Sequence, residues 1–303
     1  MHVGAAITFN GLQGRSAAEV PRIARLVEDS GLDSLWAPEH IVTFEAYKPN
    51  FPYTSDGVPP FNLHEGKEEC LTVLAAAAAV TSKIRLGTCV LILPQRNPVI
   101  LAKQLISIDN LSGGRLTLGV GVGWAEEEFE AVSVPFDRRG ARADEYIRAM
   151  RALWSAEEIS TFEGEFVTLH GAVMLPKPVQ LSRIPIMVGG QSMRALRRAA
   201  ALGDVWLCGP VALDALWAEM RRADGACEAL GRDPRTLRRN YMTYARGDEL
   251  IRVIEGARER GVDELLGIVG VSGDDRSLSQ GIEEIAAAVA AVRESESAGA
   301  RTG

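Results

Sequence analysis

The chain alternates short apolar runs with longer amphipathic stretches along almost its whole length. Parallel strands that helices cover read as continuous apolar runs of this kind, because both of their faces are buried. Eight such runs predict a closed (β/α)8 barrel, a TIM barrel of the α/β class, with an open doubly wound sheet as the competing architecture. The predicted strands are Val3–Phe9, Ser34–Ala37, Ile84–Leu93, Leu116–Gly121, Ile184–Val188, Asp204–Leu207, Arg239–Tyr244 and Glu264–Val269.

Three segments depart from this alternation. Residues 41–66, after the second strand, are rich in Pro, Asn, Gly and aromatic residues, and a loop of that length is usually a lid or a binding loop. Between the fourth and fifth strands, Phe162–Phe166 predicts a β-hairpin, which is an insertion rather than a barrel element. We expect one domain over residues 1–293 and a disordered polar tail over residues 294–303.

Composition limits the partners of such a domain. The 303 residues are 47% hydrophobic, and they carry a net charge of -7 and a pI of about 5.3. An acidic surface repels phosphate backbones, so we expect neither nucleic acid nor an anionic membrane as a partner. The longest apolar run, Leu71–Val80, is shorter than the roughly 20 residues that span a bilayer. The N-terminus lacks the pattern of a signal peptide, so we expect a cytoplasmic protein.

The cysteines and histidines show no metal-binding pattern. The four cysteines lie in apolar segments without metal-ligand or redox spacing, and we interpret them as buried thiols. The four histidines are scattered and no HExxH sequence is present, so the sequence predicts no metal site. The cysteines are Cys70, Cys89, Cys208 and Cys227.

In a barrel of this type the loops after the strands form the active site, so unusual residues there are the candidates for chemistry. Glu39 and His40 follow the second strand. The imidazole is either a proton donor or hydrogen-bond partner for a bound ring, or it ties down the long loop that follows, and position alone leaves both open. Thr88, Cys89 and Val90, in the third strand, read by pattern as ordinary buried strand.

Glycines alternate at the end of the fourth strand, in the sequence Gly119-Val120-Gly121-Val122-Gly123-Trp124. A strand face without side chains would let a planar ligand lie against it, and a tight strand-to-helix turn is the alternative. The spacing does not match GxGxxG, which argues against a nicotinamide dehydrogenase. The acidic run Glu126–Glu128 is explained most simply as negative charge in the first turn of a helix.

The turn Gly189-Gly190-Gln191-Ser192 follows the fifth strand and precedes a predicted helix over Met193–Leu202. Glycines before a helix N-terminus present N–H groups to an anion, and Ser192 adds a hydroxyl, so this turn predicts a phosphate site rather than a simple connector. The anion-binding turn, the glycine face and His40 together describe a pocket for a flat, phosphorylated cofactor.

Four motifs, in order, resemble the luciferase-like monooxygenase superfamily, and most closely the oxidoreductases of that superfamily that use the deazaflavin coenzyme F420. The resemblance runs from the first strand to about Gly209. The motifs are Ser34–His40, Ile84–Thr88 with Leu93–Pro98, Leu111–Leu116 with Gly123-Trp124, and Pro185–Gly190.

The resemblance implies a set of site residues. It places the cofactor phosphate on backbone amides at Gly189, Gly190 and Gln191, and the ring over the third and fourth strands. It implies a cis peptide bond at Cys89–Val90 behind the ring, and a role for His40 at the ring edge or as catalytic acid or base. The predicted cofactor contacts are Glu39, His40, Thr88, Cys89, Val90, Gly121, Val122, Gly123, Gly189, Gly190, Gln191 and Ser192.

The resemblance also bears on the substrate. F420-dependent sugar-phosphate dehydrogenases carry a catalytic Glu where this chain has Trp124, which argues against a sugar phosphate and against a mechanism with two acid/base residues. We expect Trp124, Phe51 and Tyr53 to line an apolar or aromatic substrate pocket, and the loop over residues 41–66 to close over it.

These observations predict an F420-dependent oxidoreductase that transfers a hydride between the cofactor and a small organic substrate, with His40 exchanging a proton. Two alternatives stay open: an FMN-dependent monooxygenase on the same fold, and a non-catalytic F420-binding protein. The resemblance also suggests a homodimer, the commonest symmetric assembly.

Overall fold

A computed structural model describes residues 1–10, 16–52, 54–59, 66–180, 183–271 and 276–299. Its strands are β1 (His2–Ile7), β2 (Ser34–Ala37), β3 (Arg85–Thr88), β4 (Leu91–Ile92), β5 (Leu116–Gly121), β6 (Ile159–Glu163), β7 (Thr168–Val173), β8 (Ile186–Gly189), β9 (Val205–Cys208), β10 (Arg238–Thr243) and β11 (Glu264–Val269). Its α-helices are α1 (Val20–Asp29), α2 (Cys70–Val80), α3 (Pro98–Ser112), α4 (Glu126–Ala131), α5 (Arg139–Trp154), α6 (Met193–Leu202), α7 (Leu213–Glu228), α8 (Gly247–Glu259) and α9 (Leu278–Gly299). Three short 3-10 helices are η1 (Ala17–Glu19), η2 (Leu93–Gln95) and η3 (Pro234–Thr236).

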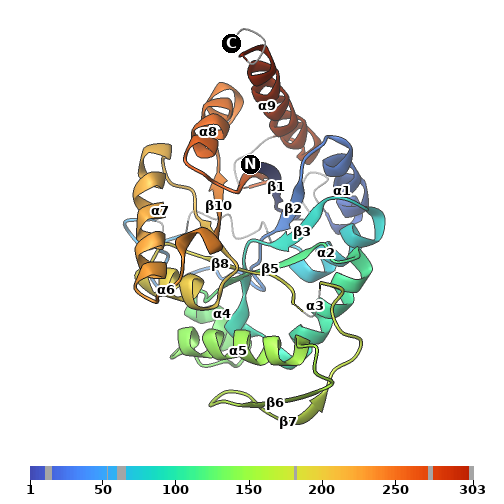
Figure 1. The fold of residues 1–303 in the computed structure, drawn as a ribbon, viewed down its shortest axis with the longest axis vertical. Coiled ribbons are helices and arrows are strands. Elements are labelled where there is room, and N and C mark those ends of the chain that lie inside the picture. The colour runs from blue at the N-terminus through green and yellow to red at the C-terminus, as the bar shows by residue number, and fades with distance from the viewer. Residues whose placement is uncertain (11–15, 53, 60–65, 181–182, 272–275, 300–303) are drawn as a thin grey trace.

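The parallel strands close into a barrel with the helices outside it (Figure 1). The sheet order is β3-β2-β1-β11-β10-β9-β8-β5-β4, and a further pairing of β3 with β5 joins its two ends. That pairing sets Leu86 beside Leu116 and Gly87 beside Thr117. Since β3 and β4 together form the third barrel strand, the predicted TIM barrel is confirmed and the open sheet is excluded.

The third barrel strand is interrupted, although the sequence predicts one continuous strand over Ile84–Leu93. β3 pairs with β2 as far as Thr88, and β4 pairs with β5, with Leu91 beside Val120. β3 also pairs with β5, so β5 borders both pieces, and the peptide bond between Cys89 and Val90, which separates them, is cis. The continuous strand was therefore wrong, and the cis bond that the resemblance implies is confirmed.

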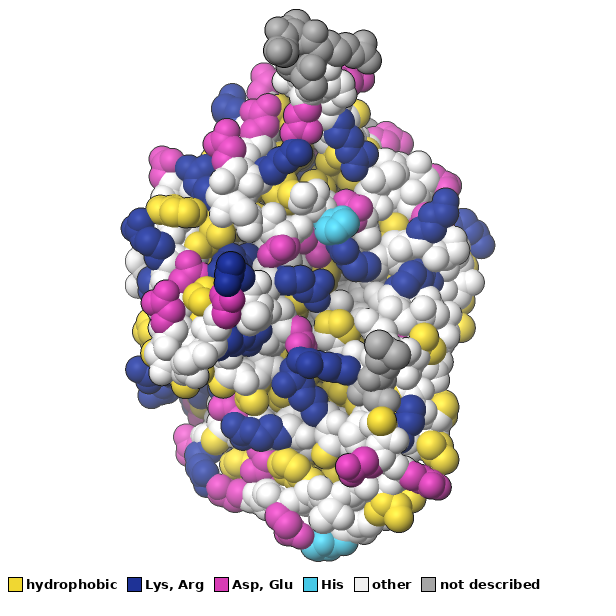
Figure 2. All heavy atoms as spheres, viewed as in Figure 1, with side chains coloured by type: hydrophobic (Ala, Val, Ile, Leu, Met, Phe, Trp, Pro, Cys, Tyr) yellow, Lys and Arg dark blue, Asp and Glu magenta, His cyan; other side chains and the backbone are white. Residues whose placement is uncertain are grey.

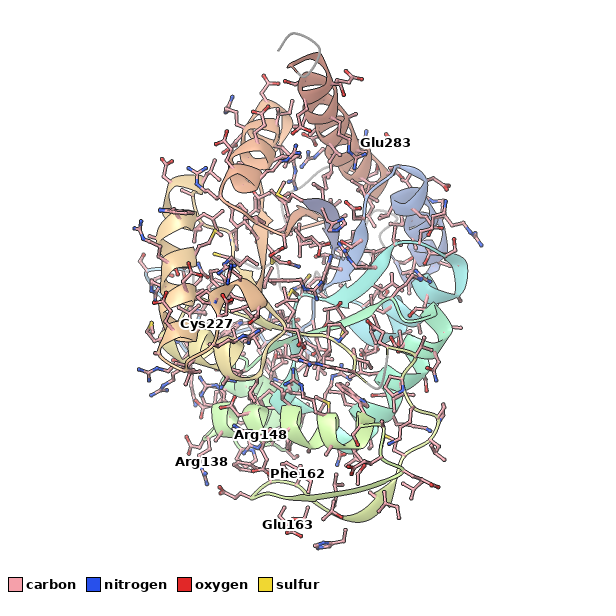
Figure 3. The ribbon with its side chains drawn as sticks, in the orientation of Figure 1. Arg138, Arg148, Phe162, Glu163, Cys227 and Glu283 are labelled. Atoms are coloured by element: carbon pink, nitrogen blue, oxygen red, sulfur yellow. The ribbon has the colours of Figure 1, made fainter. Side chains whose placement is uncertain are left out.

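The hairpin insertion between the fourth and fifth barrel strands is confirmed, and residues 164–167 form its turn. β6 and β7 lie along the outside of α5, with Phe162 directed toward that helix and Glu163 away from it (Figure 3). Glu145 of α5 accepts hydrogen bonds from the turn, including one of 2.6 Å from the N–H of Phe166. The insertion therefore packs on the barrel's outer helices and takes no part in the barrel sheet.

The C-terminal segment is helical further than its composition suggests. α9 continues to Gly299, so residues 294–299 are helical and the predicted disorder is wrong for them; residues 300–303 lie outside the described residues. Two causes favour the helix: Glu294 and Glu296 are good helix formers, and Glu296 forms an ion pair with Arg258 of α8.

The surface carries mixed charge. Lys and Arg side chains are interspersed with Asp and Glu over the face in Figure 2, without a large field of one sign. Among the described residues, no helix combines the length and the apolar character that a membrane span requires.

A buried polar group closes the N-terminal end of the barrel. We call this group, Ser34, Arg85, Asn240 and Glu264, the polar floor. Glu264 accepts hydrogen bonds from the Ser34 hydroxyl and from the Asn240 amide (3.0 Å), and the Arg85 guanidinium lies 3.1 Å from it. An apolar cluster fills the barrel beyond this floor, so chemistry is left to the opposite end, which we call the mouth. The cluster consists of Ala6, Trp36, Cys89, Met187, Val205, Leu207, Leu266 and Ile268.

Candidate active site

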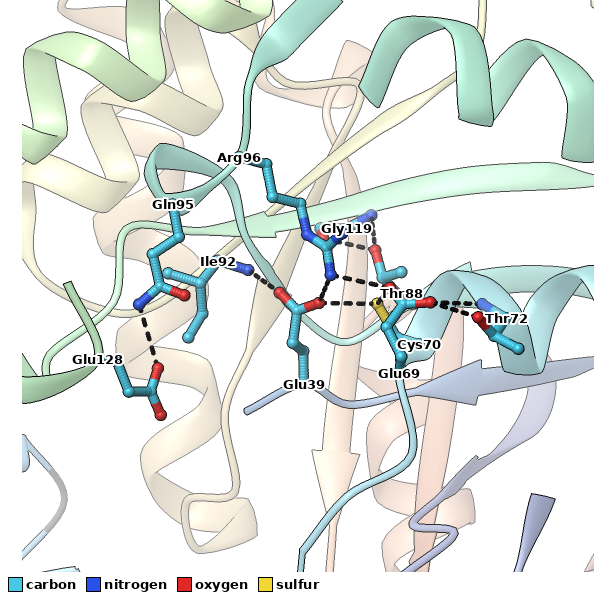
Figure 4. A network of polar contacts seen from close by, with 10 residues as sticks. All are labelled: Glu39, Glu69, Cys70, Thr72, Thr88, Ile92, Gln95, Arg96, Gly119 and Glu128. Atoms are coloured by element: carbon cyan, nitrogen blue, oxygen red, sulfur yellow. Dashed lines mark hydrogen bonds and ion pairs between the residues drawn. The ribbon is translucent and has the colours of Figure 1, made fainter. Parts of the chain in front are cut away.

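His40, just after β2, meets a carboxylate from the other side of the mouth. Its Nδ1 lies 2.5 Å from Oε1 of Glu128 in α4. The second oxygen of that carboxylate accepts a 3.1 Å hydrogen bond from Gln95 of η2 (Figure 4). The Glu128 side chain is 1% exposed and the His40 side chain 11% exposed. A fully buried acid therefore holds an imidazole that solvent still reaches.

Glu128 is not apparent from the sequence, because it belongs to an acidic run that suits the first turn of a helix. In the structure, two residues of that run bind the loop after β2 instead. Glu126 pairs with Nζ of Lys48 at 2.8 Å, and Glu127 accepts from the Lys48 N–H at 2.7 Å. Trp124 stands where the resemblance implies a catalytic Glu, but Glu128 supplies a carboxylate beside His40 from a nearby position. Its position four residues after Trp124 is a weak signal in the sequence.

Aromatic side chains gather around Trp124 beside His40. The rings of Tyr47 and Phe51 lie 5.1 Å from the Trp124 ring, and the His40 ring lies 5.8 Å from it. Burial, with the negative charges of Glu128 and Glu127, raises the pKa of Tyr47, so its phenol stays neutral. Trp124 and Phe51 thus come together as expected, whereas Tyr53 lies outside the described residues.

The glycines at the mouth face protein atoms rather than open space. A Cβ on Gly119 would lie 1.8 Å from the carbonyl oxygen of Thr88. On Gly121 and Gly189 it would lie 2.8 and 2.9 Å from the methyl groups of Val90. The interpretation of a bare glycine face is therefore wrong on this side, because these glycines admit the interrupted third strand. Thr88 is locked there by its hydroxyl, which donates to the Gly119 carbonyl at 2.6 Å.

The glycine turn after β8 is held by its carbonyl groups. Trp206 donates to the Gly190 carbonyl at 2.8 Å and Arg222 donates to the Gln191 carbonyl at 3.0 Å. In a trans peptide the N–H points opposite to the C=O, so the N–H groups of Gln191 and Ser192 point away from these partners. Both N–H groups lack a protein acceptor among the described residues, which suits them to an anion.

Two details of this turn differ from the expected roles. The Gly190 N–H donates to Leu207 at 3.3 Å, so the implied phosphate contact of Gly190 competes with a strand hydrogen bond. The Ser192 hydroxyl caps α6 by accepting from the Ala195 N–H at 3.2 Å. The amides of Gln191 and Ser192 are therefore better candidates than the Gly190 amide.

Arg139, which the sequence analysis did not single out, lies beside the end of β5. Its Nε donates to the carbonyl of Gly123 at 3.1 Å, and its guanidinium lies 3.8 Å from the centre of the Phe136 ring. Burial, followed by the charge of Arg194 in the first turn of α6, lowers the pKa of Arg139. Two cations held close together beside an amide-lined turn are typical of an anion site.

Glu39 is engaged by protein groups at the end of β2. Its carboxylate accepts a 2.9 Å hydrogen bond from the Ile92 N–H, a 3.2 Å contact from the Cys70 thiol and an ion pair from Arg96 (Figure 4). Arg96 also pairs with Glu69, which caps α2, at 2.8 Å. These contacts join the two ends of the loop after β2, and a direct cofactor contact by Glu39 stays a prediction.

The thiols are buried and unoxidised, as the sequence predicts. Burial raises the pKa of Cys89 and of Cys208 to about 12, so both thiols are neutral at neutral pH. Possible ligand atoms of Glu39, Glu69 and Cys70 lie within 4.8 Å of one another. The Arg96 guanidinium already supplies the positive charge between the two carboxylates, and this arrangement suits an ion pair better than a metal.

Residues 1–249 match the family model described as luciferase-like monooxygenase. The chain belongs to this family. An uncharacterized protein of Mycobacterium tuberculosis is 36% identical over 71% of this chain and 74% of its own length.

Relatives with assigned activities match shorter stretches. An F420-dependent glucose-6-phosphate dehydrogenase of Kineococcus radiotolerans is 35% identical over 60% of this chain and 49% of its own length. An FMNH2-dependent dimethylsulfone monooxygenase of Pseudomonas putida is 34% identical over 46% and 39%. A solved F420-dependent secondary alcohol dehydrogenase shares the fold, with a TM-score of 0.77, 18% identity, and 96% and 98% of the two chains covered. The luciferase-like family thus contains members that act with either cofactor.

Proposed function

We propose that this luciferase-like protein is an F420-dependent oxidoreductase that transfers a hydride between the deazaflavin and a small organic substrate. The observation that carries the proposal is the partly exposed imidazole of His40, set beside Trp124 at the mouth of the barrel. Hydride transfer at a carbon–oxygen centre requires a proton to move at the oxygen. A histidine exchanges that proton readily near neutral pH.

The residues at the mouth fit a flat, phosphorylated cofactor. The Gln191 and Ser192 amides, with the guanidinium groups of Arg139 and Arg194, would hold its phosphate. Val90, half-buried between the glycines of β5 and β8, would support the ring. When bound, the deazaflavin supplies the hydride chemistry, while the barrel supplies orientation.

The aromatic group would define the other side of the site. Trp124, Phe51 and Tyr47 present an apolar surface next to His40, which favours an uncharged or aromatic substrate over a sugar phosphate. Lys48 fastens the loop after β2 to α4, so this loop would exclude water while the substrate is bound.

Cofactor binding tests the proposal directly. The purified chain is titrated with F420, FMN and riboflavin, and quenching of cofactor fluorescence gives the dissociation constants. We expect F420 to bind more tightly than FMN, and turnover with a panel of alcohols and ketones. Preference for FMN together with oxygen consumption would instead support a monooxygenase. Tight F420 binding without turnover on the whole panel would support a non-catalytic F420-binding protein.

A matched pair of glycine variants tests the phosphate turn. Gly190 has a φ of 112° and Gly231, in a remote turn, a φ of 69°, so alanine is strained at both. We expect Gly190→Ala, and not Gly231→Ala, to weaken binding of F420 and FMN while riboflavin, which lacks the phosphate, binds as before. The homodimer stays a separate prediction that light scattering tests.

A further inference from the structure

We infer that Glu128, held by Gln95, is a positioning residue that fixes the tautomer of His40 and makes Nε2 the atom that exchanges protons with the substrate. The inference rests on the proposed role of His40 at the mouth and extends it by naming the reacting nitrogen.

The tautomer follows from the kind of hydrogen bond that each group makes. An ionised carboxylate accepts hydrogen bonds and donates none. An ionised Glu128 can only accept in its 2.5 Å contact with Nδ1 of His40, and from this we infer that the ring proton is on Nδ1. A neutral imidazole with its proton on Nδ1 carries its lone pair on Nε2, so proton exchange with a substrate falls to Nε2.

Gln95 makes this orientation rigid. Its amide donates to the second oxygen of Glu128 at 3.1 Å, and its own side chain is buried. The next residue, Arg96, pairs with Glu39, the neighbour of His40. Two consecutive residues of one segment thus hold both His40's partner and the residue before His40 (Figure 4). A buried acid needs such partners, because an unsatisfied carboxylate oxygen is costly away from water.

Oxidation of an alcohol, one of the small organic substrates proposed for testing, requires the loss of one proton and one hydride. The O–H bond of the alcohol breaks and its proton passes to Nε2, which turns His40 into an imidazolium stabilised by Glu128. The C–H bond would break with its electron pair, and an oxidised deazaflavin, held by the residues proposed above, would supply the acceptor for that hydride. The carbon–oxygen bond becomes a carbonyl. In the reverse direction the imidazolium returns the proton to the carbonyl oxygen.

Nitrogen-15 NMR of the histidine rings tests the tautomer without cofactor or substrate. The full-length chain is labelled with ¹⁵N-histidine, and His40→Ala identifies the His40 signals. We expect the wild type to show the Nδ1–H form, and Glu128→Gln to show the Nε2–H form in part, because an amide can donate as well as accept. Glu130→Gln, at an exposed position of the same helix, is the control and should leave the wild-type pattern.

Two further results separate this inference from the proposed function. In the F420-dependent assay we expect Glu128→Gln to lower kcat by up to about 10⁴-fold with little change in KM, as for other histidines left in the wrong tautomer. Gln95→Ala should give a smaller loss in the same direction. A wild-type Nε2–H signal, or an unchanged tautomer in Glu128→Gln, would overturn the positioning role and leave the proposed function intact. A changed tautomer with unchanged kcat would mean that His40 does not carry the substrate's proton.

Discussion

Two buried glutamates lie at opposite ends of this barrel and differ in the partner that balances their charge. Glu264 in the polar floor is paired with Arg85, which keeps its charge at every accessible pH. Glu128 at the mouth is paired with His40, whose ring nitrogens can take up and release a proton. The floor is thus a fixed ion pair, whereas the mouth contains a pair whose charge changes with the proton it handles.

This difference separates a structural use of buried charge from a chemical one. The floor's donors all come from barrel strands, so they lock the strands in register. The mouth's partners come from a loop, a short helix and a 3-10 turn, which place a titratable ring beside an aromatic group. Substitutions at the floor should therefore change stability, and substitutions at the mouth should change turnover.

The largest expected effect is on turnover at the mouth. Replacing His40 by Ala removes the proton exchanger, so we expect turnover to fall by about 10²- to 10⁴-fold. Cofactor affinity should change little, because the phosphate and ring contacts lie elsewhere. Steady-state kinetics with parallel fluorescence titration measures both. His170→Ala, on the exposed hairpin, is the control, and an unchanged turnover in His40→Ala would remove that residue from the mechanism.

At the floor we expect the largest loss of stability. Glu264→Ala leaves Ser34 and Asn240 without their acceptor and Arg85 without its ion-pair partner. Breaking a buried pair costs about 3–5 kcal/mol. Because Arg85 is partly exposed, we expect the free energy of unfolding, measured in urea, to decrease by about 3 kcal/mol, the lower end of that range. Glu283→Ala, on the outer surface of α9 (Figure 3), should stay within about 0.5 kcal/mol of the wild type. A loss as small as the control's would mean that the floor does not stabilise the barrel.

A smaller effect tests whether the mouth is packed as tightly as the floor. The Cβ of Gly121→Ala would press on Val90, and forced repacking of a core usually costs about 1–3 kcal/mol. Displacing Val90 should also weaken cofactor binding. Gly225→Ala, inside α7 with no atom within 4 Å of the new Cβ, should instead stabilise the chain by about 0.5–1 kcal/mol. Equal stabilities of the two variants would show that the space beside Gly121 accommodates a methyl group without displacing Val90.

The fold was predictable because most of its strands can be recognised from the local sequence alone. Buried parallel strands such as Glu264–Val269 are short apolar runs, and helices such as α6 begin and end where their sequence suggests. The break in the third strand was not visible in its pattern, because it depends on pairing with other strands: β3 pairs with both β2 and β5, whereas β4 pairs with β5. The helical end of α9 was not predicted because its residues are small and polar. The residue that forms an ion pair with it, Arg258 of α8, is also distant in sequence.

The site was predictable where one local motif carries the chemistry. His40 and the turn before α6 stand at strand ends, and parallel strands bring those ends together. Glu128 and Arg139 were missed because their roles depend on partners from other segments: His40 and Gln95 for the acid, Arg194 for the cation. The glycines of β5 were misread for the same reason, since the atom above each belongs to another strand.

The thiol below the mouth gives the smallest effect at neutral pH, because its contribution to stability changes only at alkaline pH. Burial raises the pKa of Cys89 to about 12, whereas an unfolded thiol ionises near about pH 8.5. Above that pH the unfolded state releases a proton that the folded state keeps, so stability is complete below about pH 8.5 and falls by about 1.4 kcal/mol per pH unit up to pH 12. Tyrosines and lysines titrate in the same window, so the measurement is the difference between the wild type and Cys89→Ala in urea at several pH values. The variant's stability should fall less steeply with pH; parallel curves would mean that Cys89 ionises in the folded protein as it does in the unfolded chain.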